Sequence, residues 1–212
     1  NPDVFVFGLG VDDHKGMYGT TMDLNRLFGP ERNFYTPLSE DAMTGVAIGA
    51  ALAGKRPIHV HQRMDFLLLC MNQLVNIAAK TSYVFAGAAC VPIVVRAIIG
   101  RSWGQGAQHS QALYSHFMHV PGLKVVAPTT PHDAKGCMIA AIRDNNPVVF
   151  VEHRMLYRFR GIVPEQPYEV PFGRARVLAG GNDITIVAVS HMVVEAVRAR
   201  AHLAEIGISA EI

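Results

Sequence analysis

Short runs of β-branched and aromatic residues alternate with helix-length segments along this chain. The expected strands are Val4–Gly8, Pro57–Val60, Val91–Val95, Lys124–Ala127, Val148–Val151 and Ile184–Val189. The expected helices are Thr20–Phe28, Ser39–Ala53, Phe66–Lys80, Gln111–His119, Pro131–Arg143 and Val193–Ile206. Hydrophobicity in these strands is continuous rather than alternating, which is typical of a parallel sheet with helices on both faces. The sequence therefore predicts an α/β fold.

A change in composition divides the chain. Residues 160–175 hold several prolines and polar residues without apolar periodicity, and we interpret them as a linker. The linker follows one large domain, residues 1–159, and precedes the start of a second α/β domain, residues 176–212. That second unit stops at a second strand, Ser209–Ile212, and so small a piece cannot bury its own faces. Because the chain also begins with Asn1 rather than Met, we expect both ends to be truncated.

The composition excludes several classes of protein. Half of the 212 residues are hydrophobic and 17% are charged, against roughly 25% in ordinary domains, which excludes disorder. The apolar stretches Val46–Gly54 and Phe66–Met71 are too short to span a membrane. A net charge of +2 without a basic stripe argues against nucleic acid. Cys70, Cys90 and Cys137 lack CxxC spacing, which suits a reducing compartment. The low charge predicts faces buried against partner chains.

Two motifs have a structural explanation that is preferred to a functional one. Gly8–Asp13 follows a strand but lacks the third glycine of a dinucleotide fingerprint, and Asp13 stands where a pyrophosphate would approach. A glycine turn explains it better. His59 and His61 point to the same face of one strand, but no third metal ligand lies nearby. Two core or cleft histidines are therefore favoured over a metal site.

Two further residues could carry chemistry. Glu40 opens a helix rich in small residues, so it either complements the helix N-terminus or, partly desolvated, acts in catalysis; the residues alone favour the first. His109 follows the glycine-rich loop 100–106, and such loops after parallel strands often hold sites. It is either a proton-transfer group or a histidine beside an N-cap at Ser110. The sequence leaves these open.

Taken together, several motifs resemble the β subunit of the decarboxylating component of 2-oxo acid dehydrogenase complexes, of the pyruvate, branched-chain or acetoin type. The resemblance runs from about Val4 to the end of the chain. The motifs that carry it, in order, are Thr36-Pro37-Leu38-Ser39-Glu40, Gly45-Val46-Ala47-Ile48-Gly49-Ala50-Ala51, Asn76-Ile77-Ala78-Ala79-Lys80, Gln108-His109-Ser110-Gln111, Pro121-Gly122-Leu123-Lys124-Val125-Val126, Asp133-Ala134-Lys135-Gly136 and Ala141-Ile142-Arg143-Asp144-Asn145-Asn146-Pro147.

The resemblance implies a thiamine-diphosphate enzyme in which this chain supplies the pyrimidine-binding domain. The α partner binds the diphosphate and Mg²⁺. Glu40 matches the glutamate that hydrogen-bonds the aminopyrimidine and favours its imino tautomer. Phe66 matches the aromatic residue that stacks on that ring, and Leu38 matches a backbone contact to it. His109 matches the histidine near the reacting end of the cofactor. A weaker match is a structural potassium site formed by carbonyls of Ile93, Ala141, Ile142, Asp144 and Asn146.

Some positions depart from the family pattern. Leu9 and Val60 stand where acidic residues are usual, Ile98 replaces a proline, and Arg63 lies among several uncommon residues in Val60–Met64. The residues that match the family's cofactor contacts are present, whereas the residues expected around the substrate differ from the family pattern.

The resemblance predicts oxidative decarboxylation of a 2-oxo acid, with acyl transfer to a lipoyl group. It implies an α subunit, a second β copy in an α2β2 heterotetramer and a lipoyl-bearing acyltransferase as partners. It also implies a location in the cytoplasm of a bacterium or, for a eukaryotic protein, in the mitochondrial matrix. The alternatives are a transketolase-like or synthase-like enzyme that transfers a two-carbon unit, and a non-catalytic paralogue that serves assembly.

Overall fold

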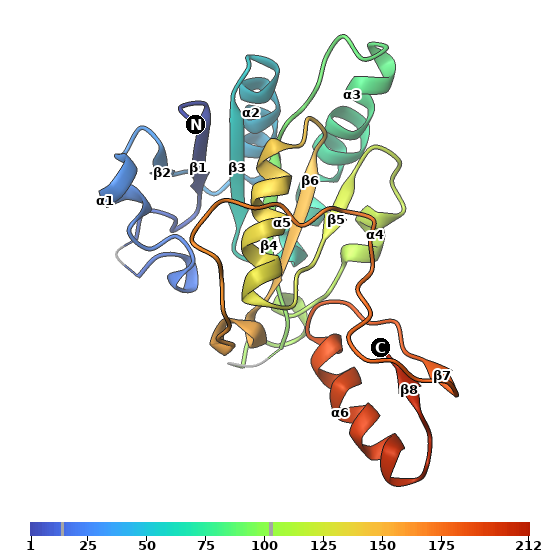
Figure 1. Ribbon diagram of the computed structural model, residues 1–212. Helices are drawn as coiled ribbons and strands as arrows, with labels where there is room; N and C mark the ends of the chain where they lie inside the picture. The colour runs from blue at the N-terminus through green and yellow to red at the C-terminus, as the bar shows by residue number, and fades with distance from the viewer. Residues whose placement is uncertain (14, 102–103) are drawn as a thin grey trace. The chain divides into compact units, whose positions relative to one another are not determined.

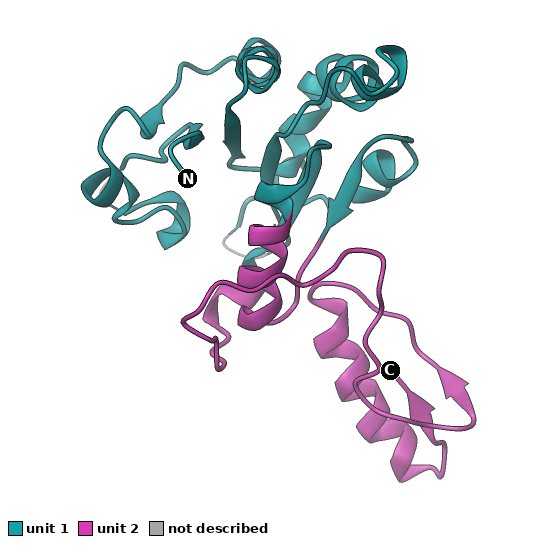
Figure 2. Ribbon diagram, turned by 45° about the horizontal axis from the view of Figure 1, so that its top comes forward, with its two compact units in different colours: residues 1–126, 141–154 teal, residues 127–140, 155–212 magenta. Residues whose placement is uncertain are grey.

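The computed structural model of the chain describes residues 1–13, 15–101 and 104–212 (Figure 1). The chain forms two compact units (Figure 2). Unit 1 contains residues 1–126 and 141–154, and unit 2 contains residues 127–140 and 155–212.

Unit 1 is built on a six-stranded parallel sheet in the order β2-β1-β3-β4-β6-β5. Its strands are β1 (Val4–Gly8), β2 (Asn33–Tyr35), β3 (Arg56–His61), β4 (Val94–Ile99), β5 (Lys124–Val126) and β6 (Val148–His153). Every residue of β4 is buried, which explains why its sequence is apolar except for Arg96 rather than alternating. The predicted α/β fold with a parallel sheet is confirmed.

The edge strand β2 was not expected from the sequence. It has only three residues and starts with Asn33, whose side chain is buried and donates to the carbonyl of Val11 over 3.2 Å. Strand β4 also begins later and extends further than predicted, through Ile99.

Helices and shorter helical turns connect the strands of unit 1. They are η1 (Met17–Gly19), α1 (Leu24–Phe28), α2 (Glu40–Leu52), η2 (Met64–Cys70), η3 (Asn72–Ala78), α3 (Ala79–Val84), η4 (Ala107–His109) and α4 (Tyr114–Met118). The predicted single helix Phe66–Lys80 is therefore divided: η2 is a 3₁₀ helix, η3 is a π-helix and α3 is an α-helix. Such π segments are frequent at functional sites.

Helix α2 packs on β3 and on the η2–η3 segment. Its buried side chains are Thr44, Ala47, Ile48 and Ala51. Because most of them are small, the helix backbone comes close to the sheet. This contact places the first turn of α2 at the carboxyl end of the strands.

Helix α5 (Pro131–Arg143) starts as the sequence predicts. The hydroxyl of Thr130 accepts a hydrogen bond from the backbone N–H of Asp133 over 3.1 Å, which is an N-cap contact. The turn η5 (Arg154–Arg158) follows β6.

Unit 2 includes a small βαβ motif formed by β7 (Ile184–Thr185), α6 (Met192–Glu205) and β8 (Ala210–Glu211). The strand predicted over Ile184–Val189 is paired at two residues only, and Val187 is 91% exposed. Within the same unit, the ring of Tyr168 stacks on His132 with centroids 4.5 Å apart.

Across the described residues, no helix combines the length and the apolar character that crossing a membrane requires.

Candidate active site

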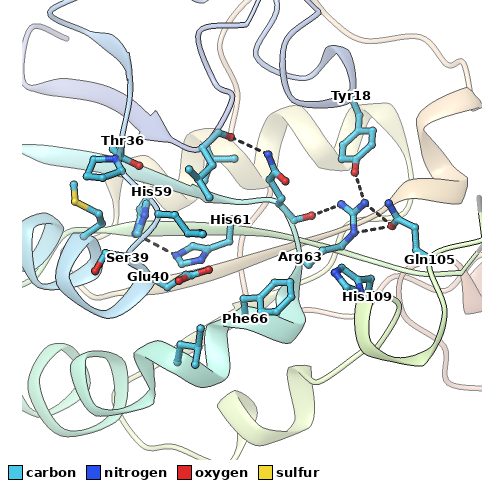
Figure 3. A pocket seen from close by; sticks show the side chains of 17 residues that line it. Tyr18, Thr36, Ser39, Glu40, His59, His61, Arg63, Phe66, Gln105 and His109 are labelled. Atoms are coloured by element: carbon cyan, nitrogen blue, oxygen red, sulfur yellow. Dashed lines mark hydrogen bonds between the residues drawn. The ribbon is translucent and has the colours of Figure 1, made fainter.

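A cavity of about 530 Å³ opens at the carboxyl ends of β1 and β3 (Figure 3). The chain leaves β1 toward β2 on one side and β3 toward β4 on the other, so this is the point where the strand order reverses. Ligands of open α/β sheets bind at such points. The lining residues are Leu9, Tyr18, Thr36, Pro37, Leu38, Ser39, Glu40, Met43, His59, Val60, His61, Gln62, Arg63, Phe66, Leu69, Gln105 and His109.

The four residues proposed for cofactor and catalysis all line this cavity. Leu38 comes from the connection between β2 and α2, Glu40 from the start of α2, Phe66 from η2 and His109 from η4. The structure thus brings together side chains from three separate segments. Leu9 and Val60, which stand where acids are usual, line the same cavity.

Glu40 is the first residue of α2. The positive end of the helix dipole favours a carboxylate there. Glu40 is therefore placed where it can complement the N-terminus of α2, as the sequence alone suggested. Within the described residues, however, its side chain makes no hydrogen bond and no ion pair. A half-buried carboxyl that faces a cavity without a protein partner is available to a ligand.

A chain of hydrogen bonds runs from the backbone of Glu40 into the sheet. The hydroxyl of Thr44 donates to the carbonyl of Glu40 over 2.7 Å, and Thr44 Oγ1 lies 3.3 Å from Nδ1 of His59. Since that hydroxyl proton is committed to Glu40, we assign a protonated Nδ1 to His59. Nε2 of His61, 3.2 Å away, then accepts from the same N–H.

Both histidines are neutral in the folded protein. Burial lowers the pKa of His59 to about 4. Burial, and then the charge of His59, lower the pKa of His61 well below its usual value. The ring of Phe7 stacks on His59 with centroids 4.6 Å apart. The pair therefore lies in the cleft as two uncharged, mutually hydrogen-bonded rings. In the described part of the chain, His, Cys, Asp and Glu side chains form no group of three that could hold a metal.

Sequence reasoning did not identify Tyr18 and Gln105 as residues of the cavity, and it gave Arg63 only as one of several uncommon residues. Tyr18 comes from η1, Arg63 from the two residues between β3 and η2, and Gln105 from the loop before η4. Arg63 is only 4% exposed. The signal in the sequence was an arginine shortly after an apolar strand, but its partners Tyr18 and Gln105 lie far away along the chain.

Two of the five residues predicted to bind potassium, Ile142 and Asp144, contact a side-chain cation through their carbonyls. Nη1 of Arg56 donates to the carbonyls of Ile142 and Asp144 over 2.9 and 3.1 Å. The carbonyls of Ile93 and Ala141 each accept a backbone N–H. Burial raises the pKa of the Asp144 carboxyl, but hydrogen bonds from Lys124 and Asn146 outweigh it, so the pKa lies below its usual value.

Comparison with known proteins identifies the fold family. The profile described as "Transketolase, pyrimidine binding domain" matches residues 1–160. The chain belongs to this family. A second profile, "Transketolase, C-terminal domain", matches residues 173–212, after the pyrimidine-binding domain.

Relatives of this chain include β subunits of an oxidoreductase and of pyruvate dehydrogenase. The chain is 48% identical to the β subunit of the acetoin:2,6-dichlorophenolindophenol oxidoreductase of Cupriavidus necator, over 98% of this chain and 62% of the relative. It is 42% identical to the mitochondrial pyruvate dehydrogenase E1 component subunit beta-1 of Arabidopsis thaliana, over 100% of this chain and 60% of the relative. The chain thus spans about three-fifths of these relatives.

A solved structure shares the fold. A split-gene transketolase described as an inactive beta4 tetramer superposes with a TM-score of 0.79 at 24% identity, over 100% of this chain and 64% of the other.

Proposed function

We propose that this chain is part of the β subunit of a thiamine-diphosphate-dependent 2-oxo acid dehydrogenase of the pyruvate or branched-chain type. The observation that carries the proposal is that Glu40 and Phe66 face one cavity at the switch point of the sheet. A carboxyl group without a protein partner and an aromatic face are what a flat, basic heterocycle such as an aminopyrimidine requires. The relatives named above support the same assignment.

The residues of the cavity would hold the cofactor in distinct ways. Glu40 would hold a proton against a ring nitrogen of the aminopyrimidine, and Phe66 would stack on the ring. Leu38 would contact the ring through its backbone. Thiamine diphosphate, when bound, supplies the electron sink that decarboxylation of a 2-oxo acid needs.

The other groups act around that centre. His109 would hold or move a proton at the reacting end and help pass the acyl group to lipoyl. Thr44 binds the backbone of Glu40 and links it to the neutral His59–His61 pair. This contact fixes the first turn of α2, from which the Glu40 side chain projects.

The partners follow from the same assignment. The α subunit would hold the diphosphate and Mg²⁺, and a second β copy would complete an α2β2 heterotetramer in the bacterial cytoplasm or the mitochondrial matrix. Exposed apolar side chains on η2, η3, α3 and the turn after it support a covered face; they are Leu68, Leu69, Ile77, Tyr83, Val84 and Phe85. The lipoyl group of an acyltransferase would accept the acyl product.

The test is Glu40→Gln in the full-length β subunit, reconstituted with its α partner. An amide cannot supply the carboxyl proton, so we expect 2-oxo acid decarboxylation to fall about 100-fold. Asp41→Asn, at the next and exposed position, is the matched control and should retain the rate. Equal rates for Glu40→Gln and the parent would contradict the role of Glu40.

The alternative reactions are separated by the choice of assay. The parent assembly is given a 2-oxo acid with a lipoyl acceptor, and in parallel a ketose donor with an aldehyde acceptor. Ketol transfer without acyl transfer would favour the transketolase-like alternative. No turnover in either assay would favour the assembly paralogue, whose support in the sequence is Leu9 and Val60.

A further inference from the structure

Arg63 is a buried cation in the wall of the same cavity. It is the second residue after β3, directly precedes η2 and is 4% exposed. Figure 3 shows its guanidinium beside His109 and Gln105, on the side of the cavity away from Ser39. Neither the cofactor role of Glu40 nor that of Phe66 involves this side chain.

The guanidinium of Arg63 contacts neutral acceptors. Nε and Nη2 donate to the side-chain oxygen of Gln105, the former over 2.8 Å. Nη1 donates to the carbonyl of Gln62, and Nη2 to the hydroxyl of Tyr18. The charged carbon also lies 5.0 Å from the centroid of the Tyr18 ring. These bonds use four of the five N–H groups of an arginine and leave one N–H on Nη1.

Carboxylates near Arg63 in sequence or in the fold are directed elsewhere. Oδ1 of Asp65 accepts the backbone N–H of Gln111 over 3.1 Å, and its Oδ2 is buried without a partner. Glu152 forms an ion pair with Arg96 over 2.6 Å. Among the described residues, no carboxylate lies within ion-pair distance of Arg63.

A buried charge that is matched only by dipoles is costly, and an anion of the right shape would offset that cost. A planar guanidinium is suited to a carboxylate, which it binds with better geometry than a lysine can. We propose that Arg63 binds the carboxylate of the donor substrate and thereby selects a 2-oxo acid over a neutral hydroxyketone. This inference rests on the proposed function, because it assumes that the cavity admits such a donor.

The first test measures binding without turnover. Oxamate, an unreactive anion with the shape of pyruvate, is titrated calorimetrically into the α/β assembly. We expect Arg63→Gln to weaken oxamate binding at least about tenfold, as loss of a charge-assisted pair predicts. Arg26→Gln, an exposed arginine on α1 that pairs with Asp23, is the control and should bind as the parent does. No oxamate binding by the parent, or equal binding by Arg63→Gln, would overturn the proposal.

The second test separates selection from a structural role. For Arg63→Gln we expect kcat/KM for pyruvate to fall about tenfold, mainly through KM, while kcat/KM for acetoin is unchanged. An equal fall for both donors would contradict a role in selection. Arg63→Lys covers the case in which the glutamine variant does not assemble: weakened oxamate binding in an intact tetramer supports the proposal, and unchanged binding contradicts a contact that depends on the guanidinium.

The two proposals can fail separately. A parent assembly that binds oxamate through Arg63 but decarboxylates no 2-oxo acid would contradict the proposed function and leave the carboxylate site in place. If Arg63→Gln decarboxylates pyruvate as fast as the parent, the proposed function would be supported and the carboxylate site at Arg63 would be contradicted. The alternative is that Arg63 pairs with a carboxylate of the α subunit. In that case Arg63→Gln would lose the tetramer on size-exclusion chromatography, and Arg63→Lys would bind oxamate as the parent does. That result would contradict a role of Arg63 in substrate binding.

Discussion

The rings of Phe66 and His109 meet edge to face, with centroids 5.3 Å apart and planes inclined by 72°. Phe66 lies in the turn after β3 and His109 in the turn after β4, and these two strands are neighbours in a parallel sheet. Their carboxyl ends therefore lie side by side. This contact joins the residue proposed to stack on the cofactor to the residue proposed to act at its reacting end.

Replacing Phe66 should weaken cofactor binding more than it affects folding. Phe66→Leu keeps an apolar side chain on η2 but removes the aromatic face, and stacking of a base on an aromatic ring contributes about 1–3 kcal/mol. We expect thiamine diphosphate to bind at least about tenfold more weakly to the α/β assembly, as measured by calorimetry. Phe28→Leu, at an exposed position on α1, is the control. Equal affinities in the two variants would contradict the stacking role.

The stability of the protein should fall as the pH drops below about 6.5. The pKa of His59 is about 4 in the folded state against 6.5 for a free histidine, so on acidification the unfolded chain binds the proton first. The stabilisation is fully present above pH 6.5 and is lost progressively as the pH falls toward 4. Each buried histidine then contributes a slope of up to about 1.4 kcal/mol per pH unit. Chemical unfolding at pH 7, 6 and 5 measures it.

The source of that slope can be checked by substitution. The double variant His59→Phe with His61→Phe removes both neutral rings and should show a shallower dependence of unfolding free energy on pH. His119→Asn, at an exposed position, should keep the slope of the parent. If the double variant has the same slope as the parent, the histidine pair is not its cause.

Gly8 should not tolerate a side chain. Its φ is +151°, and a Cβ would lie 2.3 Å from the carbonyl oxygen of Val60 on the paired strand β3. We expect Gly8→Ala to lower the free energy of unfolding by about 2 kcal/mol or more. Gly49→Ala is the counterpart: it lies in the middle of α2 with open space around the new methyl group, so it should stabilise the chain by about 0.5–1 kcal/mol. Destabilisation of equal size in both would contradict this explanation.

The potassium site stays a prediction. If the carbonyls around Asp144 hold K⁺, thermal unfolding in KCl should occur at a higher temperature than in NaCl of equal ionic strength, because a bound ion stabilises the folded state. Arg56→Met would remove the guanidinium that now donates to two of these carbonyls and should increase the difference. The same unfolding temperature in both salts would contradict the potassium site, and the guanidinium of Arg56 would then be the cation that these carbonyls bind.

The strand and helix pattern could be predicted from the sequence because the buried strands are mostly apolar and do not alternate between apolar and polar residues. That information is local, and it predicted five of the six strands in the large sheet. The edge strand β2 was not predicted because its three residues, which begin with Asn33, do not form an apolar run. The helix predicted over Phe66–Lys80 is divided into η2, η3 and α3. Its first turn lines the cavity, and the spacing of apolar residues along the sequence carries no information about that cavity.

The sequence by itself determined the parallel α/β sheet and, through its motifs, the candidates Leu38, Glu40, Phe66 and His109. Only the tertiary structure decided that these side chains share one cavity, since strand order depends on hydrogen bonds between distant segments. It also decided the environment of Arg63. Its partners Tyr18 and Gln105 come from other loops, and whether a buried charge meets a carboxylate or only neutral dipoles depends on which loops the fold brings together.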